Sequence, residues 1–246
     1  MRLLSYNIRY GGAGRVEFIA RVITRYRPDI VVLQEATRPD VVGDLARRTM
    51  MADWRSYANQ SLAFLSRERV VHAEWHRPLL SRHAFIEIVP SDERARIFGL
   101  HLSAVHAAWT ERRRLFEIRT LLRSIARHQH GFHVLAGDFN TLAPGEQLDV
   151  RRLPPRLRPF VWLSGGRIKW RTIQTVLDAE YVDAYRVQHA LAPGHTFPAT
   201  DPHLRLDYVF VPRAFADRVQ SCDVVKDADA ERASDHLPLV ADFAVA

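Results

Sequence analysis

The sequence predicts an α/β protein in which two mixed β-sheets pack together and carry helices on their outer faces. Two observations lead to this prediction. Apolar strand-like segments alternate with amphipathic helical segments along the 246 residues, and polar residues suited to chemistry follow some strands but precede others. If these polar residues share one rim, some strands run opposite to their neighbours. That favours mixed sheets over an all-parallel doubly wound sheet, and the number of strands suggests two sheets.

The first half of the chain begins with a β-α-β unit. Leu3–Ile8 reads as a short apolar strand, and after several glycines apolar residues from Phe18 to Tyr26 recur at helical spacing until Pro28 ends the helix. The run Ile30–Leu33 is apolar and rich in β-branched residues, as expected for a strand covered on both faces. Three further strand segments are predicted at 62–75, 83–89 and 97–102.

The second half begins with a long helix from Thr110, which is expected to cap it, to Ile125. A buried strand, Phe132–Ala136, then leads directly into Gly137. Residues 144–171 are rich in proline, glycine and arginine, which predicts a long surface excursion or lid with little regular structure. A short helix at Thr172–Ala179 and two final strands, Leu206–Val211 and Leu237–Phe243, complete the expected order.

Length and composition favour one globular domain over residues 1–246, with 47% apolar residues to form its core. No apolar run approaches the roughly 20 residues that span a bilayer, and the start of the chain lacks the features of a signal peptide. We therefore expect a cytoplasmic, monomeric protein without a transmembrane segment. The single cysteine, Cys222, cannot form an internal disulfide and is expected to be a small, at least half-buried apolar residue.

The net charge of +7 comes mostly from arginine and favours an anionic partner, either nucleic acid or phospholipid headgroups, although a compositional bias of the genome explains it equally well. Arginines and aromatic residues are interleaved from Arg151 to Arg171, and Arg167 and Trp170 are candidate substrate-binding residues there. This segment suits a phosphate-lined groove with base stacking, peripheral contact with an anionic lipid surface, or a loop pinned by its tryptophans.

Candidate catalytic residues lie where predicted strands reach the surface, a placement that fixes side chains rigidly. Several carboxylates brought together there would repel one another unless a cation lay among them. Oxygen ligands suit magnesium or manganese better than zinc or copper, and a chain with one cysteine cannot form a thiolate zinc cluster. The candidates are Asn7, Glu35, Asp138, Asn140, Asp207, Asp235 and His236.

Five segments that contain these candidates resemble, in order and spacing, the motifs of the endonuclease/exonuclease/phosphatase superfamily. The resemblance covers nearly the whole chain, and although each short segment alone is weak evidence, five in order are specific. It implies a four-layered α/β sandwich of the deoxyribonuclease I type. The segments are Ser5-Tyr6-Asn7-Ile8, Leu33-Gln34-Glu35, Gly137-Asp138-Phe139-Asn140, Leu206-Asp207-Tyr208 and Ser234-Asp235-His236-Leu237-Pro238.

The resemblance also implies a role for each matched residue. Glu35 would be the main ligand of Mg²⁺ or Mn²⁺, with Asn7 and Asp235 completing or flanking the metal site and Asn7 also contacting substrate. Asp138 and Asn140 would orient the attacking water and bind the phosphate. His236 would contact the scissile phosphate or transfer a proton, and Asp207 would hold its imidazole in one tautomer.

His101 resembles the histidine that deoxyribonuclease I-type nucleases, sphingomyelinases and inositol phosphatases carry after the corresponding strand, so we expect it to be catalytic; the alternative is a structural histidine. This feature argues against a dedicated abasic-site enzyme. The sequence departs from the family where Leu62 stands, since an asparagine is frequent there. The segment Gly194–Pro198 resembles a loop that shapes the pocket in bacterial members.

The sequence therefore predicts a metal-dependent hydrolase of phosphodiesters, with nucleic acid as the first substrate. A phospholipid, sphingomyelin or inositol phosphate substrate is the alternative, because His101 is shared with those branches. A second alternative is a binding module that keeps the fold without catalysis.

Overall fold

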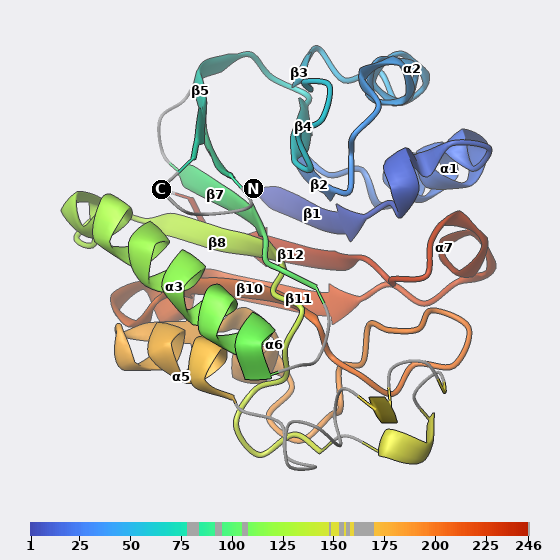
Figure 1. The fold of residues 1–246 in the computed structure, drawn as a ribbon. Coiled ribbons are helices and arrows are strands. Elements are labelled where there is room, and N and C mark those ends of the chain that lie inside the picture. Colours follow the sequence, from blue (N-terminus) through green and yellow to red (C-terminus); the bar gives the residue numbers. More distant parts are fainter. Residues whose placement is uncertain are drawn as a thin grey trace.

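The computed structural model describes residues 1–77, 84–91, 95–104, 108–147, 149–152, 155, 158–159 and 170–245. Two six-stranded sheets pack face to face, with helices on the outer face of each (Figure 1). Both sheets contain parallel and antiparallel neighbours. The four-layered α/β sandwich expected from the sequence is confirmed.

In the first sheet the strands lie in the order β11-β12-β1-β2-β4-β3. The two central strands β1 and β2 are parallel, with Asn7 opposite Gln34, and β12 runs antiparallel to β1. The parallel pair therefore ends at the edge where β12 begins. The strands are β1 (Arg2–Asn7), β2 (Ile30–Gln34), β3 (Asp53–Arg55), β4 (Ala63–Ser66), β11 (Val219–Val224) and β12 (Leu239–Phe243).

In the second sheet the order is β5-β6-β7-β8-β10-β9. Strand β8 pairs in parallel with β7 and antiparallel with β10, so that Asp138 lies opposite both His101 and Asp207. This register alone brings three predicted site residues together. The strands are β5 (Val70–His76), β6 (Phe85–Pro90), β7 (Arg96–His101), β8 (His133–Asp138), β9 (Tyr181–Asp183) and β10 (Asp207–Pro212).

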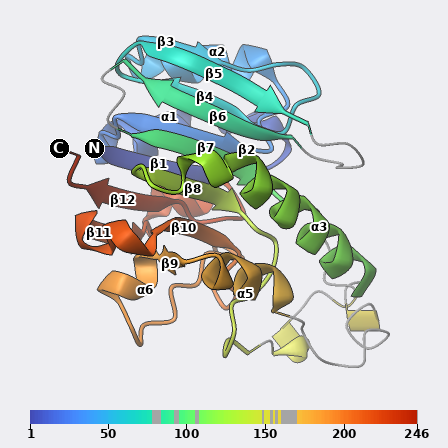
Figure 2. The ribbon, with the colours of Figure 1, turned by 90° about the vertical axis from the view of Figure 1, so that its left-hand side faces the viewer.

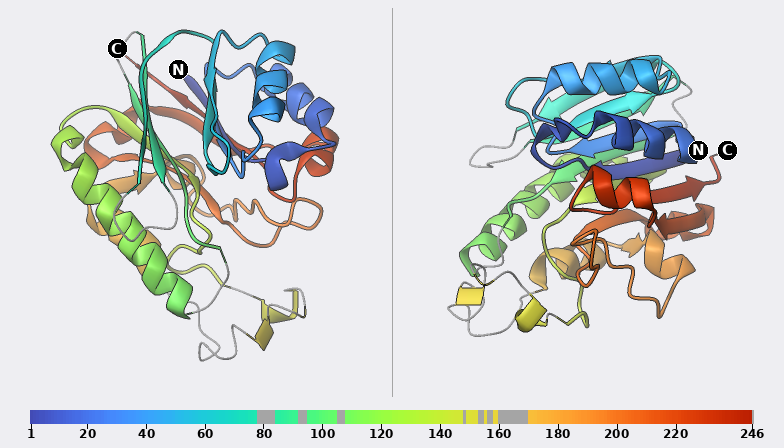
Figure 3. Two further views of the ribbon diagram at one scale, coloured as in Figure 1. Left: turned by 45° about the horizontal axis from the view of Figure 1, so that its top comes forward. Right: turned by 90° about the vertical axis from the view of Figure 1, so that its right-hand side faces the viewer.

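Two groups of helices form the outer layers (Figures 2 and 3). Helices α1 (Val16–Tyr26), α2 (Pro39–Arg48) and α7 (Ala228–Ala233) cover the first sheet, whereas α3 (Ala108–Ile125) and α5 (Arg171–Asp178) cover the second. Helix α6 (Ala184–Gln188) lies beside β11 and β10. Short 3₁₀ turns are η1 (Tyr10–Gly12), η2 (Ala126–His128), η3 (Val150–Arg152) and η4 (Arg213–Arg218).

Alternation along the strands separates three apolar cores. On β2, Val32 faces the core between the two sheets, while Val31 and Leu33 face α1 and α2. Leu135 of β8 faces the third core, beneath α3 and α5. Because both faces of the central strands are buried, their register is strongly specified. Cys222 is fully buried in the core between the sheets, as expected.

Several elements differ from the sequence-based expectation. Thr110 does not cap α3, because it is the third residue of the helix and is buried. Short elements between the predicted ones were not expected, among them α2, β3, β9, β11 and α7. Parts of the segment 144–171 lie outside the described residues, and so do His83 and the candidate Arg167. No helix within the described ranges is long and apolar enough to span a membrane.

Candidate active site

The predicted site residues gather at one edge of the two packed sheets. Asn7, His101 and Asp138 are the last residues of β1, β7 and β8, whereas Asp207 is the first residue of β10. Because each of these strands is buried among its neighbours, the positions of their ends are fixed by the sheets.

Asn7 connects the two sheets through its amide. Its Nδ2 donates to Asp138 Oδ2 at 3.0 Å and to Glu35 Oε1 at 3.3 Å, and its Oδ1 accepts the backbone N–H of Arg9 at 3.0 Å. The side chain is almost fully buried, at 1% exposure. Three of the predicted residues therefore form one hydrogen-bonded unit.

Asp138 follows a position in β8 that requires glycine. Gly137 has φ +154°, and a Cβ at this position would lie 1.9 Å from the carbonyl oxygen of Leu100 on β7. Asp138 Oδ1 accepts the backbone N–H of Asn140 at 2.8 Å, while Asn140 Nδ2 donates to Asp138 Oδ2 at 3.1 Å and to the Leu102 carbonyl at 3.0 Å. Asn140 thus fixes the carboxylate beside the end of β7.

Asp207 and His236 form a buried pair. His236 Nδ1 lies 2.9 Å from Asp207 Oδ2, which also accepts the hydroxyl of Thr196 at 2.6 Å. The ring of Phe197 packs against the imidazole with centroids 4.9 Å apart. The loop that the sequence suggested would shape the pocket therefore holds both members of the pair. Its sequence signal was the resemblance of Gly194–Pro198 to bacterial relatives.

Two histidines flank Asp138. The Nε2 atoms of His101 and His236 lie 3.8 and 3.9 Å from Asp138 Oδ2. Burial opposes the imidazolium of His236, but the Asp207 and Asp138 carboxylates outweigh it and raise the pKa of His236 to about 10. For Asp138, burial disfavours the charged carboxylate and raises its pKa to about 7, although the His236 cation acts in the opposite direction. A cationic donor beside a carboxylate that titrates near neutrality suits proton transfer at a phosphate.

His101 has a different partner for its other ring nitrogen. Its Nδ1 makes a short contact with the hydroxyl of Ser61, which lies in the connection between β3 and β4. The imidazole is buried at 8% exposure. A hydroxyl therefore orients His101, whereas a carboxylate orients His236.

Glu35 lies at the rim in a strained backbone conformation. It has φ +54°, and Arg9 and Tyr10, across from it, have φ +49° and +48°. Hydrogen bonds hold this arrangement, because Glu35 Oε2 accepts the N–H of Tyr10 at 2.7 Å and the Glu35 carbonyl accepts that of Gly11 at 2.8 Å. The carboxylate is thus fixed at the mouth of the site.

Asp235 reaches the same region through its neighbours. The hydroxyl of Ser234 donates to the Asn7 carbonyl at 2.6 Å, and Arg9 Nε lies 3.3 Å from Asp235 Oδ2. Burial lowers the pKa of the Arg15 guanidinium, whereas the carboxylates of Asp235 and Glu35 raise it. Asp235 and Glu35 therefore both lie near this guanidinium. The structure pairs Asp235 with Arg9 rather than directly with Glu35.

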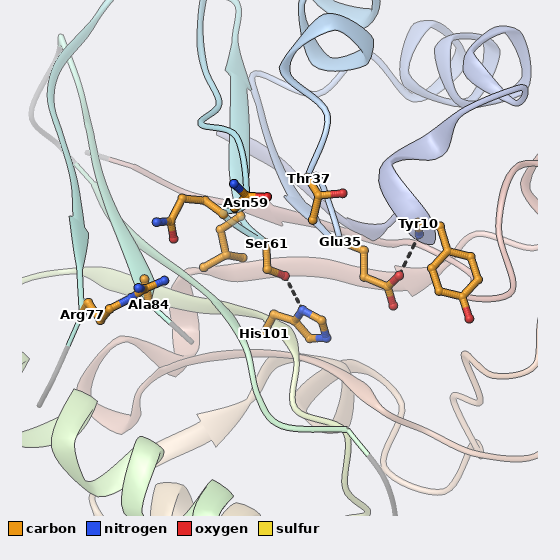
Figure 4. Close-up of a pocket in the computed structure, with 10 residues that line it drawn as sticks. Tyr10, Glu35, Thr37, Asn59, Ser61, Arg77, Ala84 and His101 are labelled. Atoms are coloured by element: carbon orange, nitrogen blue, oxygen red, sulfur yellow. Dashed lines mark hydrogen bonds between the residues drawn. The ribbon is translucent and has the colours of Figure 1, made fainter. Parts of the chain in front are cut away.

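A pocket of about 340 Å³ opens beside Glu35 and His101 (Figure 4). In the close-up Tyr10 and Arg77 stand at opposite ends of it, with Glu35 and His101 between them. Sequence reasoning missed its polar lining, because the contributing loops are far apart in the chain. The missed residues are Tyr10, Thr37, Asn59, Gln60, Ser61 and Arg77.

The side chains present fit a hard divalent cation near Glu35. Asn7, which is hydrogen-bonded to Glu35, offers an amide oxygen, and Asp235, which pairs with Arg9, offers a carboxylate; the single thiol, Cys222, is buried in the core between the sheets. A second group, formed by Asp138, Asp207 and His236, has ligand atoms within 4.8 Å of one another. Its imidazole holds a proton and its carboxylates accept several hydrogen bonds, so acid–base chemistry suits it better than metal ligation.

Trp170 is separate from this group of residues. It stands at the N-cap of α5 and is 39% exposed. Two residues later, Thr172 donates through its backbone N–H and its hydroxyl to the buried Glu111 of α3, at 2.9 Å in both bonds. Trp170 is thereby placed beside the start of α3.

Comparisons with known proteins bear on the family and on the fold. The family model described as "Endonuclease/Exonuclease/phosphatase family" matches residues 4–236. None of the curated proteins matches the sequence significantly. The three similar solved structures described next are at most 22% identical in sequence to this chain, so they bear on the fold alone.

One similar structure is the 3′ phosphatase NExo from Neisseria bound to a product DNA hairpin, with a TM-score of 0.74, 22% identity and 99% of each chain covered. An AP endonuclease from Archaeoglobus fulgidus has a TM-score of 0.74 and 20% identity, with both chains fully covered. D. rerio TDP2 with a single-strand DNA product has a TM-score of 0.69 and 17% identity, with 99% of this chain and 98% of that one covered. With the family model matched from β1 to His236, the chain belongs to the endonuclease/exonuclease/phosphatase family.

Proposed function

We propose that the protein is a divalent-metal-dependent phosphoesterase that hydrolyses phosphodiester bonds in nucleic acid. The observation that carries the proposal is the Asp207–His236–Asp138 group, joined through Asn7 to Glu35 at the mouth of a pocket. Family membership supports the reaction class. Similar structures named as DNA-bound enzymes support the choice of nucleic acid.

Glu35, Asn7 and Asp235 would hold Mg²⁺ or Mn²⁺, which supplies charge neutralisation at the phosphate when bound. Asp138, fixed by Asn140 and Asn7, orients and deprotonates the attacking water. The His236 cation, held by Asp207, donates a hydrogen bond or a proton to a phosphate oxygen. Asn7 and Asn140 also offer amides to the phosphate, and Arg167 and Trp170 stay candidates for more distant substrate contacts.

The pocket bears on the choice between nucleic acid and a choline phospholipid. Arg77 at one end would repel a quaternary ammonium group, and the described lining contains one tyrosine, Tyr10, and no phenylalanine or tryptophan. The side-chain amides of Asn59 and Gln60 suit the edges of a nucleobase or the hydroxyls of an inositol phosphate. Inositol phosphates are therefore the closer alternative.

The test is hydrolysis by purified protein with Mg²⁺, Mn²⁺ or EDTA. Substrates are a plasmid, a single-stranded oligonucleotide, a chromogenic diester, an inositol phosphate and sphingomyelin. Glu35→Gln and His236→Asn are expected to abolish activity, whereas the exposed pair Glu74→Gln and His72→Asn on β5 serves as a matched control. Activity on lipid alone would overturn the choice of substrate. Activity that survives EDTA and both site substitutions would overturn the assignment of the site.

A further inference from the structure

Helix α3 presents a row of arginine and aromatic side chains that its packing does not use. Seven exposed or partly exposed positions recur three or four residues apart, so at 100° per residue they fall within an arc of about 120° on one face. Figures 1 and 3 place this helix on the outside of the second sheet. The row, called the α3 face below, consists of the arginine and aromatic residues Trp109, Arg112, Arg113, Phe116, Arg119 and Arg123, together with Thr120, which lies among them.

The aromatic residues of the α3 face are exposed and belong to none of the apolar cores that the described residues form. Trp109 is 62% exposed and Phe116 is 40% exposed. The opposite side of α3 carries Ile118, Leu121 and Ile125, which are buried in the core beneath the helix. The packing of α3 therefore does not account for the aromatic residues on its outer side.

The arginines of the α3 face also differ from those of α1 and α2. On α1 and α2 the arginines pair with carboxylates, as in Arg25 with Asp227 and Arg48 with Asp44. The two acidic residues of α3, Glu111 and Glu117, are buried and bind Arg114, Thr172 and Ser103 instead. Within the described ranges, the arginines of the α3 face have no carboxylate partner. As far as the described part of the chain goes, the face is thus a concentration of positive charge without paired carboxylates.

The α3 face begins at the edge of the molecule that holds the site. Helix α3 starts seven residues after His101, the last residue of β7, and runs back along the sheet toward the other edge (Figure 1). From Trp109 to Arg123 it extends about 21 Å, at 1.5 Å per residue. A chain whose phosphate lies at the site can therefore continue along this helix.

From this arrangement we propose that the α3 face binds a single-stranded segment of a polynucleotide substrate. The arginines contact its phosphates, and the bases stack on Trp109 and Phe116. The inference rests on the proposed function for the identity of the substrate. A membrane surface fits less well, because a helix at a lipid interface separates its aromatic side from its basic side, and the apolar side of α3 is already buried.

The test compares two double substitutions that remove equal charge from opposite outer layers. Arg119→Gln with Arg123→Gln removes two charges from the α3 face, and Arg47→Gln with Arg48→Gln removes two exposed arginines near the end of α2. Binding of a fluorescent single-stranded oligonucleotide is followed by anisotropy in EDTA, so that no hydrolysis occurs.

The salt dependence gives a quantitative expectation. For single strands, log affinity falls with log salt, and each phosphate contact makes this slope steeper by about 0.7. The slope of the α3 variant, which lacks two arginines, is therefore expected to be shallower by about 1.4. When the salt is raised from about 50 to 200 mM, both proteins lose affinity for the oligonucleotide. The factor lost by the α3 variant is expected to be about seven times smaller than the factor lost by the wild type. The α2 variant is expected to keep the wild-type slope. Equal slopes for the two variants would overturn the proposal.

Phe116→Ala tests stacking separately. It is expected to weaken single-strand binding about fivefold or more, and to leave duplex binding unchanged. Loss of binding to anionic phospholipid vesicles in the α3 variant, with oligonucleotide binding unaffected, would instead identify a lipid surface and overturn the proposal.

Hydrolysis separates this inference from the proposed function. The α3 variant is expected to cleave a small chromogenic diester at the wild-type rate while losing efficiency on a long oligonucleotide. A wild-type protein that cleaves no phosphodiester would refute the proposed function, and the binding slopes would still decide the role of the α3 face.

Discussion

Replacing Asp207 by asparagine tests the role assigned to His236. The substitution keeps the size of the side chain but removes the carboxylate 2.9 Å from Nδ1. Burial then dominates the environment of His236, and the pKa of His236 is expected to fall well below its wild-type value of about 10. A proton donor of the wrong charge state or tautomer lowers kcat/KM by about 10²- to 10⁴-fold, or about 2.7 to 5.5 kcal/mol of transition-state stabilisation.

The assay is steady-state hydrolysis of a chromogenic diester over pH, together with NMR titration of His236 in metal-free protein. Folding raises the pKa of His236, so its protonated form stabilises the fold fully below the unfolded value of 6.5, and this stabilisation disappears as the pH rises through about 10. In Asp207→Asn that loss is expected to shift to lower pH. Thr196→Val, which removes a hydrogen bond to Asp207 but no charge, is the control. Near-wild-type kcat/KM in Asp207→Asn, with His236 still titrating near 10, would refute the reasoning.

Three further substitutions test the metal site, the glycine before Asp138 and the buried carboxylate. Glu35→Gln is expected to abolish Mg²⁺ or Mn²⁺ binding measured by calorimetry, and a heat of binding like that of the wild type would exclude Glu35 as the main ligand. Gly137→Ala is expected to lower the free energy of unfolding in urea by about 3 kcal/mol or more, through overlap with the Leu100 carbonyl and backbone strain. Gly14→Ala, at φ +73° with nothing within 4 Å, should show the strain alone. The pKa of Asp138, raised to about 7, implies that metal-free protein loses stability as the pH rises from about 4 through 7; Asp138→Asn should flatten that slope.

The sequence predicted the elements whose pattern reflects burial on both faces. Strands β2 and β8 are continuous apolar runs, and both were placed within a few residues of their observed ends. Glu35 directly follows β2 and Asp138 ends β8, whereas Asp207 begins β10, and this contrast predicted mixed sheets. Local pattern is sufficient there because the sheet buries every side chain of these strands.

Other elements carry too little local signal. Strand β11 lies at the edge of the first sheet and alternates between buried and exposed residues, including exposed Gln220 and Asp223. Helix α7 has six residues, too few for a helical period to be visible, although Asp227 caps it through the N–H groups of Asp229 and Ala230.

Parts of the site depend on long-range folding. Ser61 meets His101 from a position forty residues earlier, and Thr196 meets Asp207 through a loop whose path the sequence does not encode locally. Asn59 and Arg77 reach the pocket from different connections. Such convergence is set by the packing of the two sheets, so no spacing rule within the sequence could reveal it.

The positive φ angles of Arg9, Tyr10 and Glu35 imply a trade-off between thermal stability and catalytic activity. Each such residue costs about 1–3 kcal/mol relative to a relaxed backbone. Tyr10→Gly would relieve part of this cost and is expected to yield a protein that melts at a higher temperature. The same change would loosen the N–H that fixes Glu35, so selection for heat resistance would favour a sequence with a less rigid mouth and slower turnover.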